Sequence, residues 1–171
     1  MKKTSVIQKE EILLKELLKD SSRSDRQLAK EVGTSQPTIS RLRQKLVKDK
    51  IIKNYTVIPD FYKMGYRIFA ITLVKTKHNL ASQEKRKEVF NRAKKWMITK
   101  PNIIFADFCR GTGMDGMLMS LHKSYNDFDE FMVEHNQELG DLIHDFENIL
   151  INLKKEESVK PFNIKYLALD T

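Results

Sequence analysis

Residues 24–48 read SDRQLAKEVGTSQPTISRLRQKLVK, and this stretch decides the fold of the N-terminal part of the chain. Ser24 and Gln27 have the spacing of a capping box, in which each side chain hydrogen-bonds to the other residue's backbone N–H. Gly33 can supply the left-handed backbone conformation that commonly ends a helix. The pattern predicts a short helix over residues 25–32, a glycine turn and a further helix directly after it.

The helix after the turn is expected to have two different faces. Ser35 can cap its N-terminus, and Pro37 fits close to that end because the first turn of a helix needs no backbone donor. At about 100° per residue, Ile39, Leu42 and Leu46 form one apolar stripe that faces the other helices. The opposite face is polar and cationic.

A helix with short polar groups at its start and Arg, Gln and Lys further along suits the major groove of DNA. There Arg can bridge guanine acceptors and Gln can pair with adenine, while Lys and Arg anchor phosphates. An ordinary solvated helix is the alternative interpretation. We predict DNA contacts from Ser35, Gln36, Pro37, Thr38, Ser40, Arg41, Gln44, Lys45, Lys48 and Lys53, with Ser40, Arg41 and Gln44 reading the bases.

The flanking segments complete a small DNA-binding domain. Residues 6–18 place leucines and isoleucines at helical spacing between Lys and Glu, which predicts a helix that ends near Asp20. Residues 51–58, IIKNYTVI, are rich in β-branched side chains and predict a strand or small wing. Together these elements predict a winged helix-turn-helix.

Charge is unevenly distributed along the 171 residues. Residues 1–55 hold 14 Lys and Arg against 7 Asp and Glu, a net charge of +7, whereas residues 56–171 have a net charge of +1. Such a basic excess is typical of a domain that binds a polyanion. Within the second half, residues 75–100 carry +7 and residues 101–171 carry −7. The basic helix expected at 84–100 is interpreted as a second DNA-contacting surface or as the electrostatic complement of the acidic remainder.

Several function classes are disfavoured by composition. The longest apolar runs are far shorter than the roughly 20 residues that span a bilayer, and the charged N-terminus lacks a signal-peptide core. The single cysteine, Cys109, allows no internal disulfide and is expected to be packed. The four histidines, His78, His122, His135 and His144, lack metal-ligand spacing. We predict a cytoplasmic protein with no membrane segment, no metal and no cofactor.

The second half alternates strand and helix patterns. Strands are expected at 66–76, 103–109, 117–121 and 146–153, helices at 82–98 and 125–139, and a tail strand at 162–169. This β-α-β-β-α-β order predicts an α+β, ferredoxin-like domain with two helices on one face of the sheet. The other sheet face needs a cover, for which a second subunit is the natural candidate.

These segments resemble the leucine-responsive/asparagine-responsive (Lrp/AsnC) regulators of bacteria and archaea. The likeness rests on Ile12–Leu17, on Leu28–Ser35, and on Ile51–Thr56 followed by Asp60 and Gly65-Tyr66. Lys50 departs from the pattern, because the family usually has a glycine there. The resemblance implies a DNA-binding domain over residues 1–58, a linker over 59–66, and a ferredoxin-like dimerisation and effector-binding domain over 67–171.

The resemblance further implies a sequence-specific transcriptional regulator that forms a homodimer, and in some members higher oligomers, on a palindromic double-stranded DNA site. Effectors of the family are commonly amino acids. Their binding site would correspond here to Gly111, Thr112, Gly113, Met114 and Asp115, where backbone N–H groups could hold a carboxylate and Asp115 an ammonium. A purely structural turn is the alternative for these five residues.

Two other functions remain open at this point. Some proteins that resemble this family are sirohaem decarboxylases, which keep the two-domain layout but act as enzymes. The cationic outer face of the helix at 36–48 favours DNA over that alternative. An effector-independent architectural DNA binder would make the same phosphate contacts without coupling to a ligand.

Overall fold

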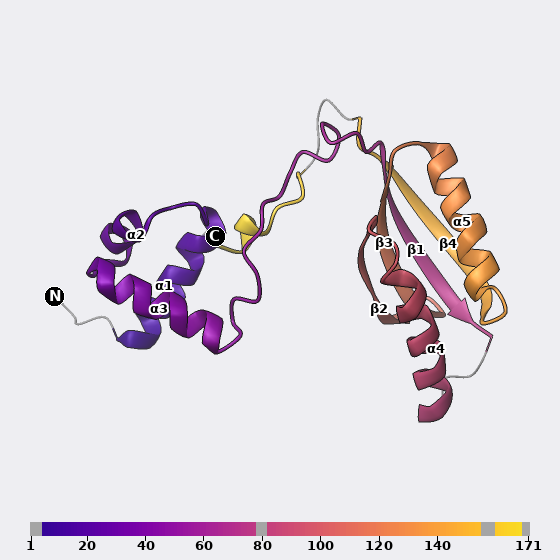
Figure 1. Cartoon of the computed structure of the whole chain (residues 1–171), viewed down its shortest axis with the longest axis horizontal. Coiled ribbons are helices and arrows are strands. Elements are labelled where there is room, and N and C mark those ends of the chain that lie inside the picture. Colours follow the sequence, from indigo (N-terminus) through magenta and orange to yellow (C-terminus); the bar gives the residue numbers. More distant parts are fainter. Residues whose placement is uncertain (1–4, 78–81, 155–159, 169–171) are drawn as a thin grey trace. The chain divides into compact units, whose positions relative to one another are not determined.

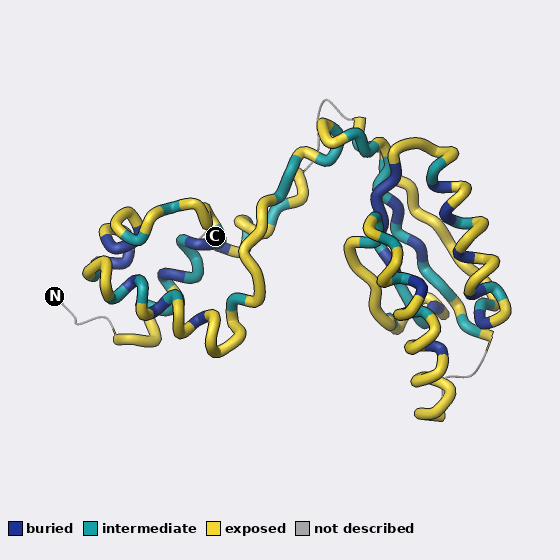
Figure 2. The backbone as a smooth tube through the Cα atoms, viewed as in Figure 1, coloured by how far each residue is buried: buried dark blue, intermediate teal, exposed yellow. Residues whose placement is uncertain are grey.

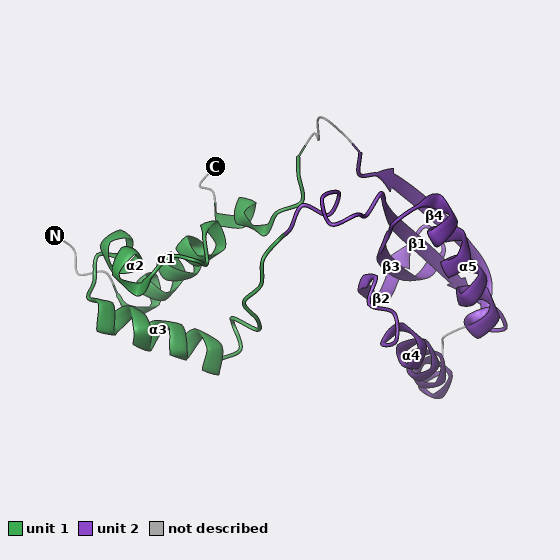
Figure 3. Cartoon of the chain, turned by 45° about the horizontal axis from the view of Figure 1, so that its top comes forward, with its two compact units in different colours: residues 1–58, 158–171 green, residues 59–157 purple. Residues whose placement is uncertain are grey.

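The computed structural model describes residues 5–77, 82–154 and 160–168. The chain divides into two compact units, one formed by residues 1–58 with 158–171 and the other by residues 59–157 (Figure 3). Within the described residues, no helix is both long enough and apolar enough to cross a membrane.

The first unit is built on three helices, α1 (Val6–Lys19), α2 (Asp25–Val32) and α3 (Gln36–Lys48) (Figure 1). The predicted capping box at the start of α2 is present, because Ser24 and Gln27 each hydrogen-bond to the other's backbone. Gly33 ends α2 with φ of 66° and ψ of 47°, in the predicted left-handed conformation. Local sequence therefore sets both limits of the helix that precedes α3.

The core of this unit consists of apolar side chains from all three helices. Leu13, Leu28 and Ile39 are fully buried, and Figure 2 shows the buried positions on the inner sides of the helices. Leu42 and Leu46 complete the predicted stripe of α3. Burying one such side chain contributes roughly 1.5–3 kcal/mol. This packing fixes which face of α3 remains exposed.

Residues 51–58 were predicted to form a strand or small wing, and the strand is wrong, since this segment has no regular secondary structure. A β-branched sequence favours an extended backbone, but a strand also needs a neighbouring chain for its ladder. Ile52 is partly buried against the three-helix core, whereas Ile51 and Val57 are exposed. The segment is an extended connection anchored at one isoleucine.

The predicted tail strand at residues 162–169 is also wrong. Ile164–Ala168 forms a short 3-10 helix, η1, which contacts α1, and Ala168 is 1% exposed. The side chain of Asn163 accepts a hydrogen bond from the backbone N–H of Lys165, which favours a turn over an extended strand. The described tail thus packs with the N-terminal unit, whereas the sequence predicted it in the domain that begins at residue 67.

The second unit has the predicted β-α-β-β-α-β order. Its elements are β1 (Ile68–Thr76), α4 (Gln83–Met97), β2 (Ile103–Gly111), β3 (Met114–His122), α5 (Tyr125–Leu139) and β4 (Ile143–Asn152). The strands form one antiparallel sheet in the order β2-β3-β1-β4. This is the ferredoxin-like arrangement predicted from the sequence.

The two faces of the sheet differ in their cover. On one face, Leu118 packs in a cluster with Trp96 of α4 and Phe131 of α5. Side chains alternate along a strand, so Ile71 lies on the other face, where it is opposite Met119 on β3 and Ile149 on β4. Ile149 is 51% exposed. An apolar sheet face therefore stands open in the isolated chain.

Lys50 adopts a positive φ of 57° directly after α3, at the position where the resembling family has glycine. A left-handed non-glycine residue costs about 1–2 kcal/mol, partly offset by the greater unfolded-state entropy of glycine. We expect Lys50→Gly to raise the free energy of unfolding of the first unit by about 0.5–1 kcal/mol. Urea unfolding followed by far-UV circular dichroism measures this change.

Gly33→Ala is the matched control, because Gly33 has φ of 66° and open space around an added Cβ. It should destabilise the same unit by about 1 kcal/mol. A Lys50→Gly variant that is less stable than the wild type would contradict this account.

Candidate nucleic-acid interface

The position of α3 is fixed by a contact with the start of α2 as well as by the core. The Nε atom of Arg43 lies 2.9 Å from a carboxylate oxygen of Asp25, and its guanidinium donates to the backbone carbonyl of Arg23 at 2.8 Å. The side chains of Arg43 and Asp25 are both about three-quarters buried. Arg43 is therefore a structural residue, which sequence reasoning did not identify because its partners lie on another helix.

The outward face of α3 carries polar groups that are available to a ligand. Arg41, Gln44 and Lys48 are exposed, and none makes a hydrogen bond or ion pair with the described part of the chain. Gln36 and Pro37 are exposed at the start of the same helix, and Ser40 is half-buried. The predicted base-reading residues Ser40, Arg41 and Gln44 thus share one helix with the exposed cation Lys48.

The N-terminus of α3 differs from the prediction in one detail. Ser35 occupies the N-cap position, but its hydroxyl hydrogen-bonds to the hydroxyl of Thr38 at 2.8 Å and not to a backbone N–H. The N–H groups of the first helical turn have no capping side chain. Such groups, at the positive end of the helix dipole, favour an anion such as a DNA phosphate.

Lys45 is held by a partner within the protein. Its ammonium lies 2.6 Å from a carboxylate oxygen of Glu10 on α1, and the hydrogen bond with Glu10 raises the pKa of Lys45. This cation was predicted to contact DNA, yet it already joins α3 to α1. Its charge still adds to the positive field at this surface, although one of its donors is occupied.

Tyr55 lies beside the same face of α3. With Arg43, Gln44, Val47 and Lys48 it borders a shallow hollow, and the ring is 51% exposed. Lys53, two residues earlier, is also exposed. An exposed tyrosine hydroxyl is a suitable phosphate donor. Sequence reasoning overlooked Tyr55 because it was treated as part of a strand.

The five residues predicted to bind an effector lie at the junction of β2 and β3 but do not form one pocket. Gly111, Thr112 and Gly113 are exposed and all have positive φ, as expected for a tight turn. Met114 is 7% exposed. Asp115 accepts two hydrogen bonds from Thr76 on β1, from its backbone N–H and its hydroxyl, both at 2.8 Å.

Two of the four histidines are buried in the second unit. His122 shares a 2.8 Å hydrogen bond with Ser120, and burial lowers its pKa. His144 is exposed, and His78 lies outside the described residues. Across residues 5–77, 82–154 and 160–168, no group of three or more His, Cys, Asp or Glu side chains is arranged to hold a metal ion.

The basic helix α4 is partly neutralised by acidic groups near α5. Arg92 lies 2.5 Å from Asp141 and also donates to the backbone carbonyl of Glu138. Lys100, just after α4, pairs with Glu134. These contacts favour the interpretation that this helix complements the acidic remainder of its own domain.

Comparison with known proteins relates the first unit to helix-turn-helix domains. Residues 9–53 match a family described as winged helix-turn-helix DNA-binding. An HTH-type transcriptional regulator of Pyrococcus horikoshii, PH0061, is 42% identical over 65 residues, which cover 38% of this chain and 43% of the relative. A similar regulator of Pyrococcus furiosus is 38% identical over 65 residues, with the same two coverages. The chain thus matches less than half the length of these curated relatives.

Whole-chain similarity appears in structure comparison. The crystal structure of PH0061 superposes with a TM-score of 0.72 at 26% identity, covering 95% of this chain and 99% of that one. LrpC of B. subtilis superposes with a TM-score of 0.69 at 24% identity, and the superposition covers 91% of this chain and 99% of LrpC. A transcriptional regulator of Neisseria meningitidis in complex with L-Met superposes with a TM-score of 0.72 at 15% identity, and the superposition covers 95% of this chain and 99% of the regulator. The latter two likenesses establish the shared fold.

The Arg43 contacts predict a difference between two neighbouring arginines. We expect Arg43→Ala to lower the free energy of unfolding of the first unit by about 1–2 kcal/mol, because it removes an ion pair and a charged hydrogen bond. Arg41→Ala should change it by less than about 0.5 kcal/mol. Urea unfolding followed by far-UV circular dichroism reports the difference.

The only tryptophan, Trp96, lies in the second unit, so its fluorescence serves as an internal control. Neither substitution should shift the fluorescence transition. Equal stability of the two variants would show that Arg43 does not hold α3 in place.

Proposed function

We infer that this chain is a DNA-binding transcriptional regulator with the two-domain architecture of the Lrp/AsnC family. The observation that carries this inference is the outward face of α3, a helix fixed by a buried core. There Arg41, Gln44 and Lys48 are exposed and have no partner among the described residues. The match of residues 9–53 to winged helix-turn-helix domains supports it independently.

The proposed reading mechanism assigns separate roles to the residues of α3. Arg41 and Gln44 contact base edges in the major groove, with Ser40 beside them, because guanidinium and amide groups match the donors and acceptors of guanine and adenine. Lys48 and Lys53 neutralise phosphates, as does the free N-terminus of α3. Lys45 contributes charge to this surface while it remains paired with Glu10.

The second unit is proposed to make the regulator a homodimer. The open sheet face carries Ile71, Met119 and Ile149 in one row, with the 45% exposed Phe105 on the edge strand β2. Contiguous apolar area of this kind marks a protein interface. A two-fold dimer would present two copies of α3 to a palindromic site.

Regulation by a small molecule is part of the proposal. A neighbour with the same fold was crystallised with L-Met. An amino-acid effector at Gly111–Asp115 would act through the exposed turn, since Met114 is buried and the carboxylate of Asp115 is bound by Thr76. We propose no enzymatic reaction, because the relatives are transcriptional regulators. A protein that reads chromosomal DNA would act in the cytoplasm.

Substitutions on α3 should separate base reading from phosphate binding. We expect Arg41→Ala and Gln44→Ala to relax sequence preference by about 1–3 kcal/mol at the base pairs they contact. Lys48→Ala should weaken binding to all sequences and reduce the slope of log affinity against log salt by about 1. Fluorescence anisotropy with specific and scrambled duplexes at several salt concentrations measures both effects.

Lys154→Ala is the matched control, because Lys154 is an exposed cation in the second unit. It should leave affinity and salt slope unchanged. If Arg41→Ala and Gln44→Ala retained the wild-type sequence preference, the assignment of base reading to α3 would be wrong.

The open sheet face predicts the effect of a buried charge at the interface. Ile149→Glu should convert the homodimer to a monomer, because the interface would have to bury an unpaired carboxylate. Val133→Glu is the control, since Val133 is 57% exposed on α5, on the helix-covered side. Sedimentation velocity distinguishes the species. A dimer that persists in Ile149→Glu and dissociates in Val133→Glu would assign the interface to the helices.

A further inference from the structure

A cavity of about 420 Å³ that is open to solvent on one side lies in the second unit, between α4, the sheet and the end of α5. Val74, Gly116 and Leu118 form its floor, and Val89, Ala93 and Met97 line it from α4. It is distinct from the turn that joins β2 to β3. Of the five residues predicted there for an effector, only Asp115 reaches the cavity wall.

Small residues keep this space open. Ala93 on α4, Ala106 on β2 and Gly116 on β3 all line it. A Cβ added at Gly116 would meet nothing closer than the backbone oxygen of Asp107, at 3.8 Å. Protein cores are normally packed to the density of organic crystals, with few voids larger than a water molecule. The sequence therefore leaves room that larger side chains could have filled.

One polar group in the cavity wall lacks a partner. His135 on α5 is 1% exposed, lines the cavity, and has a buried Nδ1 atom with no hydrogen-bond partner in the described residues. The centroid of its ring lies 5.4 Å from the centroid of the Trp96 ring, in an edge-to-face arrangement. Burial lowers the pKa of His135 to about 4, so the imidazole is neutral at pH 7. An unsatisfied buried polar atom costs about 1–3 kcal/mol, which a ligand could recover.

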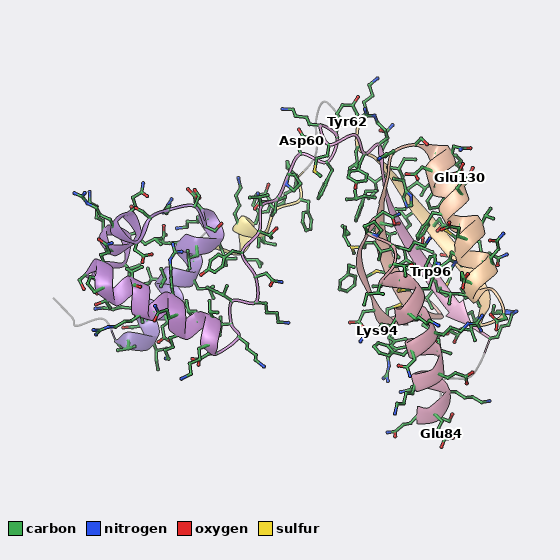
Figure 4. The ribbon with its side chains drawn as sticks, viewed as in Figure 1. Asp60, Tyr62, Glu84, Lys94, Trp96 and Glu130 are labelled. Carbon is green, nitrogen blue, oxygen red and sulfur yellow. The ribbon has the colours of Figure 1, made fainter. Side chains whose placement is uncertain are left out.

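The charged groups at the cavity do not favour an ionic ligand. The carboxylate of Asp115 already accepts two hydrogen bonds from Thr76. Lys94 on α4 is exposed (Figure 4). Its ammonium lies 5.7 Å from the centre of the Phe90 ring. The rings of Phe90 and Phe108 both line the cavity, and their centroids lie 6.0 Å apart. Asp107, which also lines the cavity, is exposed, and its carboxylate accepts a hydrogen bond from the backbone N–H of Phe108. The remaining wall is mainly aromatic and aliphatic, with Thr76 and the neutral imidazole of His135 as its other polar side chains.

We propose that this cavity binds a neutral aromatic molecule of one or two rings that carries one O–H or N–H group, and that the imidazole of His135 turns toward the cavity to accept a hydrogen bond from this group at Nδ1. The rings fill the apolar space under α4, and Phe90 and Phe108 contact their edges. The use of this site to control DNA binding rests on the proposed function, whereas ligand binding itself does not.

Isothermal titration calorimetry of the full chain with 2-naphthol, a neutral two-ring phenol, tests the proposal. One molecule should bind per chain. Ala93→Leu, which fills the cavity, should weaken binding at least about tenfold, while Asn91→Leu, on the same helix but outside the cavity, should not. His135→Phe keeps the ring and removes the nitrogen, and should weaken binding about two- to tenfold.

The unmodified chain gives a second readout that does not depend on the folding of a variant. The ¹⁵N resonance of His135 Nδ1 should shift when 2-naphthol is added. Absence of binding, or equal affinity of wild type and Ala93→Leu with no shift of this resonance, would overturn the proposal. The titration contains no DNA, so a chain that binds 2-naphthol but no DNA would refute the regulatory function and leave this site intact.

Discussion

The packing of α3 against α1 and α2 is the constraint on which the rest of the structure depends. Leu13, Leu28 and Ile39 are fully buried where the three helices meet. Because these side chains leave only one face of α3 open, the core determines which polar groups are available for the proposed contact with DNA. The Arg43 contacts with Asp25 and Arg23 add a polar restraint at the edge of this core. The proposed recognition of DNA therefore depends on this packing, because an α3 helix that could rotate about its axis would not present a fixed set of hydrogen-bond donors to the bases.

In the second unit, apolar packing determines which face of the sheet is covered and which face is left exposed. Trp96 of α4 and Phe131 of α5 cover one sheet face, where they pack with Leu118 of β3, and the other face remains apolar and open. Burial of that face between two copies would place two reading helices in one assembly, which a palindromic operator requires. The cavity beneath α4 lies in this same unit, so a ligand there could alter the domain that is proposed to join two subunits.

Local signals in the sequence predicted the elements well, whereas contacts between distant residues could not be predicted. Ser24, Gln27 and Gly33 set the limits of α2 through neighbours three to nine residues apart, so the sequence alone was sufficient. The segments at 51–58 and 162–169 have strand-like composition, but strand formation depends on a partner elsewhere in the chain. Similarly, only the fold shows that Lys45 is paired with Glu10, 35 residues away, and that Arg41 has no partner in the described part of the chain.

Sequencing the fragments that the wild-type chain retains from sheared genomic DNA tests the central claim most directly. A regulator that reads bases through paired α3 helices should enrich a short inverted repeat, with half-sites about one helical turn apart. Retained fragments with the same sequence composition as the input would contradict base reading and leave, at most, a sequence-independent DNA binder.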